Sequence, residues 1–195
     1  MPENLEVIKI SAFEGCTSIS EIIIPENVSL GSYAFKDCSG LNVLFISDGV
    51  TKENSWTTTR IFYGCENVDI VSVPANWLYK IINDFDIKKL TVTHTAENDF
   101  SVCYSDSLET VIFDDGITTI ERLQVYECKN LKEITLPKSI KAIEKSAFNN
   151  CPSLISIKYE GTIDEWNSIE IEGDWDPEKT IAKVYCSDGE IEIVY

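Results

Sequence analysis

Seven cysteines are the residues of this sequence with the widest range of chemistry, because thiols form disulfides, bind metal ions and attack electrophiles. The number is odd, and no Cys-x-x-Cys pair occurs. Five of them recur at one position of a repeated pattern: Cys16, Cys38, Cys65, Cys128 and Cys151. In two further copies Asp84 and Ser105 replace the cysteine, which indicates a packing position. Disulfides between neighbouring copies are within reach, but we expect free, buried thiols that act as small apolar groups.

The other groups that could act in catalysis or bind a metal are isolated in the sequence. His94 is the only histidine, and no Gly-x-Ser-x-Gly or comparable nucleophile motif lies near it. Carboxylate pairs such as Asp114–Asp115, or Asp84 with Asp86, have the chemistry of a glycosidase or a calcium site. Among 33 acidic residues such pairs arise by chance, and Asp114–Asp115 precedes a glycine as in an ordinary turn. We therefore predict no catalytic residue, no cofactor and no metal site, and we expect that the protein is not an enzyme.

The charge balance restricts the partners that the chain can bind. Its 33 acidic and 16 basic residues give a formal net charge of -17. Nucleic acid and anionic membrane surfaces both require a cluster of Lys and Arg, and none is visible. The longest apolar runs, such as Ile22–Ile24, are far too short to span a bilayer, and the first residues lack the features of a secretory signal. We expect a protein partner, and a chain that is itself monomeric.

The cysteine spacing belongs to a longer repeated phrase, x-Ala-Phe-x-x-Cys. It is clearest at Ser11–Cys16, Tyr33–Cys38 and Ser146–Cys151, and weaker copies end at Cys65 and Cys128. Each copy continues with apolar residues three, six and eight positions after the cysteine, and several copies then have a proline. Seven copies, two of them degenerate, follow one another at intervals of 19 to 27 residues. This period is typical of repeats that stack into solenoids.

Each position of the phrase has a structural interpretation. The apolar residues six and eight positions after the cysteine point to one side, which is the period of a β-strand. Stacked coils place these strands side by side in a parallel sheet, and the proline ends the strand. The following Val28, Val50, Ile117 and Ile140 turn back into the core, whose far side is lined by the small Ala and the large Phe. The sequence thus predicts a right-handed solenoid, mostly β, with stacked parallel strands.

The full phrase Ala-Phe-x-x-Cys-x-x-Leu-x-x-Ile-x-Ile-Pro-x-x-Val resembles the BspA-like leucine-rich repeat, over roughly residues 5 to 159. This resemblance implies a leucine-rich-repeat solenoid. It also implies a secreted or surface-exposed protein, bacterial in most cases, that adheres to host proteins or to other cells. It carries over no catalytic residue, because the repeat records core positions only.

The last part of the chain departs from the repeat and predicts a capping coil. Thr162–Glu165 matches a capping box that opens a short helix, and Trp166 in that helix is placed to cover the last coil. Residues 181–185 and 191–195 alternate like two strands joined by an Asp-Gly turn. A solenoid needs such a cap because its last apolar layer is otherwise exposed to water.

These observations divide the chain into two parts. Residues 1–158 form the solenoid, of about seven coils with the first one cut, and residues 159–195 form the C-terminal cap. The stretch Pro2–Ile8 matches the second half of a repeat, so the chain starts within a coil. We therefore expect it to be the C-terminal part of a longer surface protein.

The outward positions of the predicted strands are where a protein of this kind would bind. On the first strands these positions are apolar: Ile23, Val43, Phe45 and Ile70. A contiguous apolar patch indicates a contact surface, although β-propensity alone also enriches such residues. Residues 51–60 form a polar insertion. Its Trp56, and Trp77 in the next irregular segment, either join the binding surface or plug the core. We predict a module for protein binding or adhesion; the alternatives are a spacer in a larger surface protein and an intracellular interaction scaffold.

Overall fold

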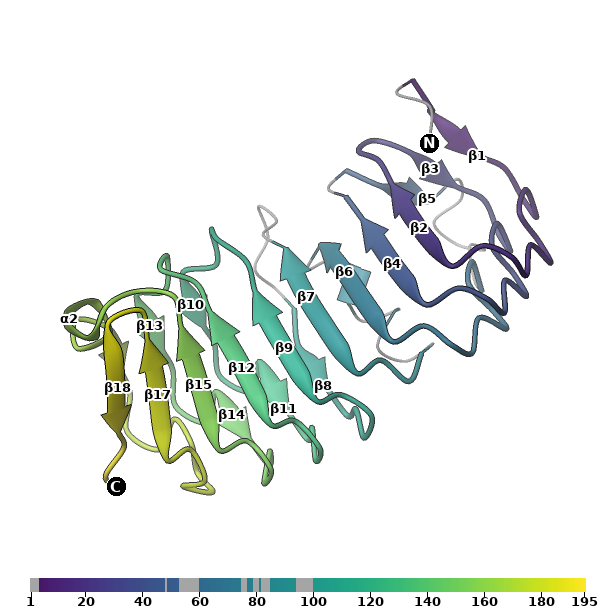
Figure 1. Ribbon diagram of the computed structural model, residues 1–195. Coiled ribbons are helices and arrows are strands. Elements are labelled where there is room, and N and C mark those ends of the chain that lie inside the picture. The colour runs from purple at the N-terminus through teal and green to yellow at the C-terminus, as the bar shows by residue number, and fades with distance from the viewer. Residues whose placement is uncertain are drawn as a thin grey trace.

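The computed structural model describes residues 4–47, 49–52, 60–74, 77–78, 81, 85–93 and 100–195. Strands lie side by side along an elongated molecule, with the two termini at opposite ends (Figure 1). The predicted solenoid is confirmed, because parallel strands stack coil upon coil in about 7 turns with very little helix. The repeated phrase of the sequence therefore corresponds to the repeated coil of the structure.

One nine-stranded sheet follows the whole length of the solenoid. In order along the sheet its strands are β2 (Glu21–Ile24), β4 (Val43–Ile46), β6 (Ile70–Pro74), β7 (Lys89–Thr93), β9 (Thr110–Phe113), β12 (Glu133–Leu136), β15 (Ser156–Tyr159), β17 (Lys183–Cys186) and β18 (Gly189–Glu192). All neighbours are parallel except β17 and β18, which form an antiparallel hairpin. In the regular coils the strand begins five residues after the cysteine, as the apolar alternation predicts.

Three short parallel sheets form the other sides of the coils. The first contains β1 (Val7–Ile8), β3 (Ser29–Leu30) and β5 (Thr51–Lys52). The second contains β10 (Thr119–Ile120), β13 (Ala142–Ile143) and β16 (Glu170–Ile171). The third contains β8 (Val102–Cys103), β11 (Val125–Tyr126) and β14 (Phe148–Asn149). Their strands are only two residues long because each coil must turn again at once to close on itself.

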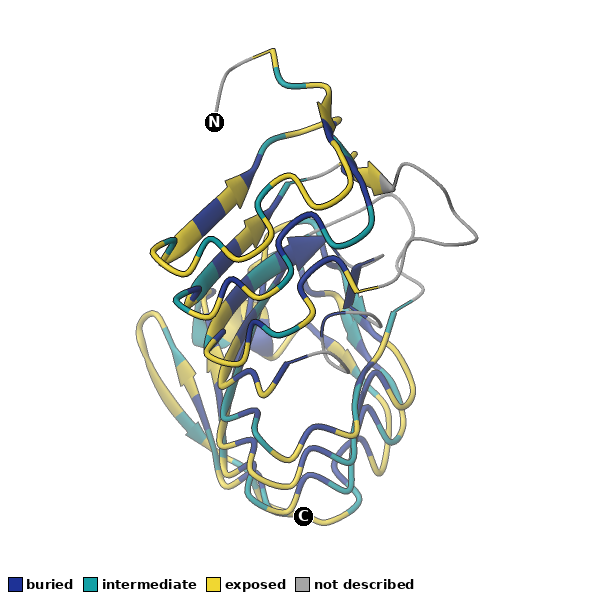
Figure 2. Ribbon diagram, turned by 90° about the vertical axis from the view of Figure 1, so that its right-hand side faces the viewer, coloured by how far each residue is buried: buried dark blue, intermediate teal, exposed yellow. Residues whose placement is uncertain are grey.

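The core is a continuous column inside the coils, where Figure 2 shows the buried segments. Along β2 exposed and buried residues alternate, so that Ile22 and Ile24 point inward. On the far side of the coils the Phe of the phrase forms a ladder. The rings of Phe13 and Phe35 are stacked with centroids 5.2 Å apart, and those of Phe35 and Phe62 are stacked at 5.4 Å. Each coil thus completes the packing of the one before it.

The cysteines of the column are free thiols that link successive coils. Cys38 donates a hydrogen bond from Sγ to the carbonyl oxygen of Phe13 at 3.1 Å, and Cys65 donates the same bond to Phe35 at 3.1 Å. Ser105, in the cysteine position of its coil, accepts a local backbone N–H at 3.3 Å instead. Burial raises the pKa of the Cys65 thiol to about 12, so this thiol stays protonated and weakly reactive at neutral pH.

Two positions of each regular coil lie in the left-handed region of backbone conformation, a feature that the sequence analysis missed. The first position, five residues before the cysteine, holds Ser11, Tyr33, Arg60, Leu123 and Ser146. The second, directly before the cysteine, holds Gly15, Asp37, Gly64, Glu127 and Asn150. Only glycine adopts positive φ without steric cost. The glycines of the second position were the available signal, and they mark it as a turn that the regular coils share.

We expect Glu127→Gly to stabilise the protein by about 1 kcal/mol, because glycine relieves the strain of a left-handed residue with a Cβ. Glu127 has φ 56 and is half-buried, so little side-chain packing is lost. The matched control is Glu133→Gly in strand β12, where glycine should instead destabilise by about 0.5–1 kcal/mol. Urea unfolding followed by circular dichroism measures both changes, and an equal loss of stability in the two variants would contradict the prediction.

The C-terminal cap begins with the short helix α2 (Ile163–Trp166), and the predicted capping box is confirmed. Thr162 accepts a hydrogen bond from the backbone N–H of Glu165, and the Glu165 carboxylate accepts one in return from the N–H of Thr162. Trp166 is buried and its ring contacts that of Tyr159 at 5.5 Å, edge to face. Among the described residues no helix has the length and apolar character needed to cross a membrane.

The closing hairpin differs from the prediction by its boundaries. Its register pairs Cys186 with Gly189, so the turn is Ser187–Asp188 and the glycine already belongs to β18. The turn is held one residue earlier than expected because it binds the start of α2. Asp188 accepts the backbone N–H of Ile163 at 2.8 Å, and the N–H of Ser187 donates to the Gly161 carbonyl at 2.8 Å.

Candidate functional site

Four of the predicted contact residues come together on three neighbouring strands. The parallel register places Ile23 of β2 beside Phe45 of β4, and Val43 of β4 beside Ile70 of β6. Adjacent strands lie about 4.8 Å apart, so side chains at paired positions are direct neighbours. Ile23, Val43, Phe45 and Ile70 thus form one continuous surface, which we call the apolar patch.

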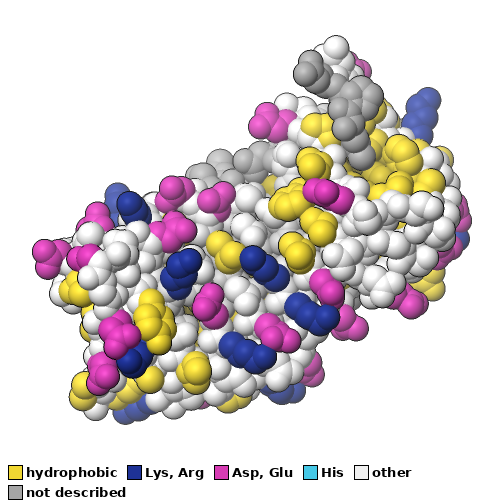
Figure 3. All heavy atoms as spheres, in the orientation of Figure 1, with side chains coloured by type: hydrophobic (Ala, Val, Ile, Leu, Met, Phe, Trp, Pro, Cys, Tyr) yellow, Lys and Arg dark blue, Asp and Glu magenta, His cyan; other side chains and the backbone are white. Residues whose placement is uncertain are grey.

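The apolar patch is open to solvent. Ile23 is 53% exposed, Ile70 37% and Phe45 36%, whereas Val43 is less exposed. In Figure 3 hydrophobic side chains gather over the N-terminal strands of the sheet face, and charged side chains over its centre. The patch therefore has the arrangement of an apolar centre next to a polar border, which is typical of protein contacts.

Of Trp56 and Trp77, the two tryptophans outside the regular repeat, the structure describes only Trp77. Trp77 is buried, and its Nε1 donates a hydrogen bond to the carbonyl oxygen of Val50 at 3.1 Å. It belongs to the core of the solenoid and not to the binding surface. Trp56, the fifth predicted contact residue, lies outside the described residues, as does His94.

Beyond β6 most outward positions of the sheet are polar, with Ile112 and Tyr185 as exceptions. Lys89 continues the row of Val43 and Ile70. Thr135 of β12 also occupies an outward position of the sheet by register, but it is only 5% exposed. Its short side chain lies between Ile112 of β9 and the long Lys158 of β15, and these larger neighbours cover it.

Ion pairs border the face where the strands begin. Lys88 and Asp69 lie 3.1 Å apart, and Lys132 and Glu109 lie 2.7 Å apart, each pair joining two neighbouring coils. The hydrogen bond from Lys132 lowers the pKa of the Glu109 carboxyl. All four groups are exposed, so these pairs contribute little to stability. They place positively and negatively charged side chains in neighbouring coils along the border of the sheet face.

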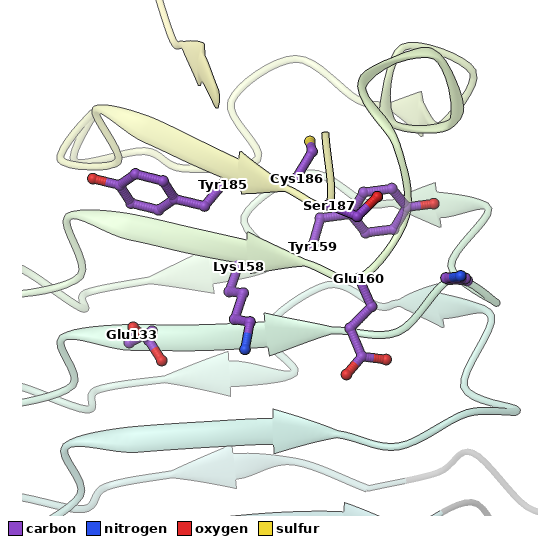
Figure 4. Close-up of a pocket in the computed structure, with 8 residues that line it drawn as sticks. Glu133, Lys158, Tyr159, Glu160, Tyr185, Cys186 and Ser187 are labelled. Atoms are coloured by element: carbon purple, nitrogen blue, oxygen red, sulfur yellow. The ribbon is translucent and has the colours of Figure 1, made fainter. Parts of the chain in front are cut away.

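A shallow groove of about 530 Å³ lies over β12, β15 and β17, at the other end of the face. In Figure 4 the side chains of Lys158 and Glu160 both extend toward β12, and the ring of Tyr185 lies over β17. The grouping of these residues was not predicted from the sequence, because they come from different coils and from the cap. The groove is open and its charges are mixed, which fits a border region better than a specific ligand site.

No group of three or more His, Cys, Asp and Glu that could hold a metal ion occurs in the part of the chain that the structure describes. The cysteines of the column are buried except Cys16, which is half-buried. Asp114–Asp115 forms the expected turn, in which Asp114 accepts the N–H of Asp115 at 3.0 Å. What the face offers a partner is exposed apolar area bordered by ion pairs.

Two solved structures are similar to this chain. A leucine rich cell surface protein from Faecalibacterium prausnitzii is 23% identical, with 87% of this chain and 55% of that chain covered and a TM-score of 0.36. A leucine-rich repeat protein from Bacteroides ovatus is 21% identical, with 93% and 59% covered and a TM-score of 0.31. The chain thus spans less than two thirds of the length of either. No curated protein matches it.

Family comparison agrees with the repeat found in the sequence and with the coils of the structure. The family described as "BspA type Leucine rich repeat region" matches residues 1–98 and 96–170, with 6 copies. The match covers most of the chain and includes every cysteine of the column. The chain belongs to the BspA-type leucine-rich repeat family.

Proposed function

We propose that this chain is a non-catalytic protein-binding module and that the apolar patch is the centre of its contact surface. The observation that carries the proposal is the register of β2, β4 and β6, which joins four apolar side chains on a face whose other outward positions are mostly polar. Solenoids of this family act through their exposed positions, since the repeat itself specifies only the core. Trp56, in the insertion at 51–60, stays part of the proposed surface on the evidence of the sequence alone.

The properties of the patch support a protein partner over other ligands. Aromatic and aliphatic side chains in the centre of an interface provide most of its binding energy, and ion pairs at the border provide orientation. The net charge of -17 disfavours nucleic acid and anionic lipid. We propose adhesion to a host or bacterial protein, with the chain at the cell surface, on the strength of family membership. We also propose a division into a solenoid at 1–158 and a cap at 159–195.

The test is a binding assay with the double variant Ile23→Asp/Phe45→Asp. Partners of the wild-type chain are captured from extracellular-matrix and bacterial surface extracts, identified, purified and titrated by biolayer interferometry. The variant buries two carboxylates in any contact centred on the patch, so we expect its affinity to fall at least about tenfold, or 1.4 kcal/mol. Both side chains point to solvent, so the circular dichroism spectrum should stay that of the wild type.

The control is Thr91→Asp/Thr110→Asp, which adds the same charges on the same sheet face beyond the patch. It should bind the partner as the wild type does. Equal affinity of both double variants would exclude the patch as the contact. If no partner were captured by the wild type, the spacer function would be favoured instead.

A further inference from the structure

Two tyrosines form an exposed aromatic pair on a side of the solenoid other than the large sheet. Tyr104 follows β8 and Tyr126 ends β11, and both strands lie behind the large sheet in Figure 1. Their ring centroids are 5.3 Å apart and their planes are at 82°, so the two rings form a corner. Tyr104 is 70% exposed and Tyr126 is half-buried. The pair therefore belongs to a different surface from the apolar patch.

A carboxylate completes this corner. The register of β8 and β11 pairs Cys103 with Tyr126, so the next residues, Tyr104 and Glu127, are neighbours in successive coils. The N–H of Tyr104 donates to the carbonyl of Tyr126 at 3.0 Å, which fixes the arrangement. The pKa of the Tyr126 hydroxyl is raised by its hydrogen bond with Tyr104 and, to a smaller extent, by the Glu127 carboxylate. Both groups thus lie within reach of Tyr126.

The charge of Glu127 is available to a ligand. In the part of the chain that the structure describes, no Lys or Arg forms an ion pair with this carboxylate. Lys129, two residues further on, pairs with Asp106 at 3.3 Å instead. The corner therefore combines two aromatic rings with an uncompensated negative charge.

The backbone at the corner is strained. Tyr104 and Glu127 both occupy the left-handed position directly before the cysteine position, with φ of 57° and 56°. In the other described coils of the repeat this position holds residue types that tolerate the conformation: Gly15, Asp37, Gly64 and Asn150. An exposed ring gains little free energy by burial that could offset the strain. Strain of this kind is concentrated at functional sites, so the two residues indicate binding.

The chemistry of the corner selects an organic cation. The faces of aromatic rings are negative and attract a cation that lies within about 6 Å of the ring centroid. Two rings at a right angle contact such a group from two sides, and the carboxylate balances its charge. The net charge of -17 favours a cation further. We propose that the corner of Tyr104, Tyr126 and Glu127 binds a quaternary ammonium group.

Choline is the probe for this site, and its control is dimethylbutanol, the neutral analogue in which carbon replaces the nitrogen. In an NMR titration of the full chain, ring currents should move the choline methyl signal upfield, and the ring protons of Tyr104 and Tyr126 should shift. We expect a dissociation constant on the order of 1–10 mM, because the corner is open to solvent. The neutral analogue should bind at least about tenfold more weakly. Equal binding of the two compounds would overturn the proposal.

The same group can come from a free compound or from a methylated lysine side chain. Choline represents the first source and trimethyllysine amide the second; binding of either supports the site, and the tighter one identifies the source. Unmethylated lysine amide should bind at least about tenfold more weakly than the tighter of them, because its ammonium group is strongly hydrated. Equal binding of lysine amide would mean general attraction to an acidic chain, and it would contradict the proposed site.

Tyr104→Gly separates binding from folding. Glycine relieves the left-handed strain and so offsets the lost ring contact. The urea midpoint of this variant should therefore be at least that of the wild type, whereas its affinity for choline should fall at least about tenfold. Tyr104→Phe keeps the ring and should bind choline as the wild type does. A Tyr104→Gly variant with unchanged affinity would exclude the corner as the site.

Two further variants test the charge and the location. Glu127→Gln keeps the shape of the side chain and removes its charge, so choline affinity should fall about fivefold. The matched control is Tyr63→Ala in another coil, because the exposed Tyr63 ring already has the guanidinium of Arg60 at 5.1 Å from its centroid. This control should bind choline like the wild type, and a loss there with none in Tyr104→Gly would place the site elsewhere. Phe45→Asp should also leave choline binding unchanged, so the two proposed surfaces are tested independently.

Discussion

Alanine in place of Gly40 is expected to lower the free energy of unfolding by about 3 kcal/mol, because the coils approach each other too closely there for a side chain. A Cβ on Gly40 would overlap the carbonyl oxygen of Thr17 in the preceding coil and would lie 3.2 Å from that of Ile19. Both obstacles are backbone atoms, so they cannot rotate away as a flexible side chain can. Relief requires the two coils to separate, which weakens the packing and the hydrogen bonds between them.

The control for this substitution is Gly173→Ala in the cap. A Cβ on Gly173 would meet no atom within 4 Å. Its effect should therefore be within about 0.5 kcal/mol of zero. Urea unfolding of both variants measures the difference, and amide exchange shows whether the loss is concentrated in the first coils. A Gly40→Ala variant as stable as Gly173→Ala would show that the coils are spaced more loosely than the structure indicates.

Removal of the Phe35 ring is expected to cost about 4 kcal/mol, the range of a fully buried Phe→Ala change. The Phe35 side chain is completely buried, and its ring is stacked between those of Phe13 and Phe62. Phe35→Ala thus leaves a cavity and also breaks a ladder that joins three coils. Because coils of a solenoid stabilise their neighbours, the loss should spread to the first coils.

Phe45→Ala is the matched control, because Phe45 lies in the same coil as Phe35 but its ring points outward. Phe45 is 36% exposed, so we expect a loss of about 1 kcal/mol or less. Chemical unfolding of the two variants, followed by circular dichroism, compares an inward and an outward ring directly. Equal destabilisation would mean that Phe45 has a structural role, and the proposed binding surface would then lose its main residue.

Parts of the candidate site were predictable because they depend on the period of the strand. Ile23, Val43, Phe45 and Ile70 occupy outward positions by simple alternation. Ile23 and Phe45 are equally spaced from their cysteines, as are Val43 and Ile70, so each pair is aligned across neighbouring strands. The cap helix was predictable for a similar reason, because a capping box is a local pattern. Thr135 shows the limit of this reasoning. Alternation gives the direction of a side chain, but its exposure depends on the size of neighbours in other coils.

The sequence by itself determined that this protein is a solenoid of leucine-rich-type coils with a column of buried cysteines and a cap, because each coil repeats the same local pattern. Contacts between coils were decided only by the tertiary structure. They include the left-handed turns beside Ala-Phe, the close approach at Gly40, and the shift of the hairpin turn toward α2.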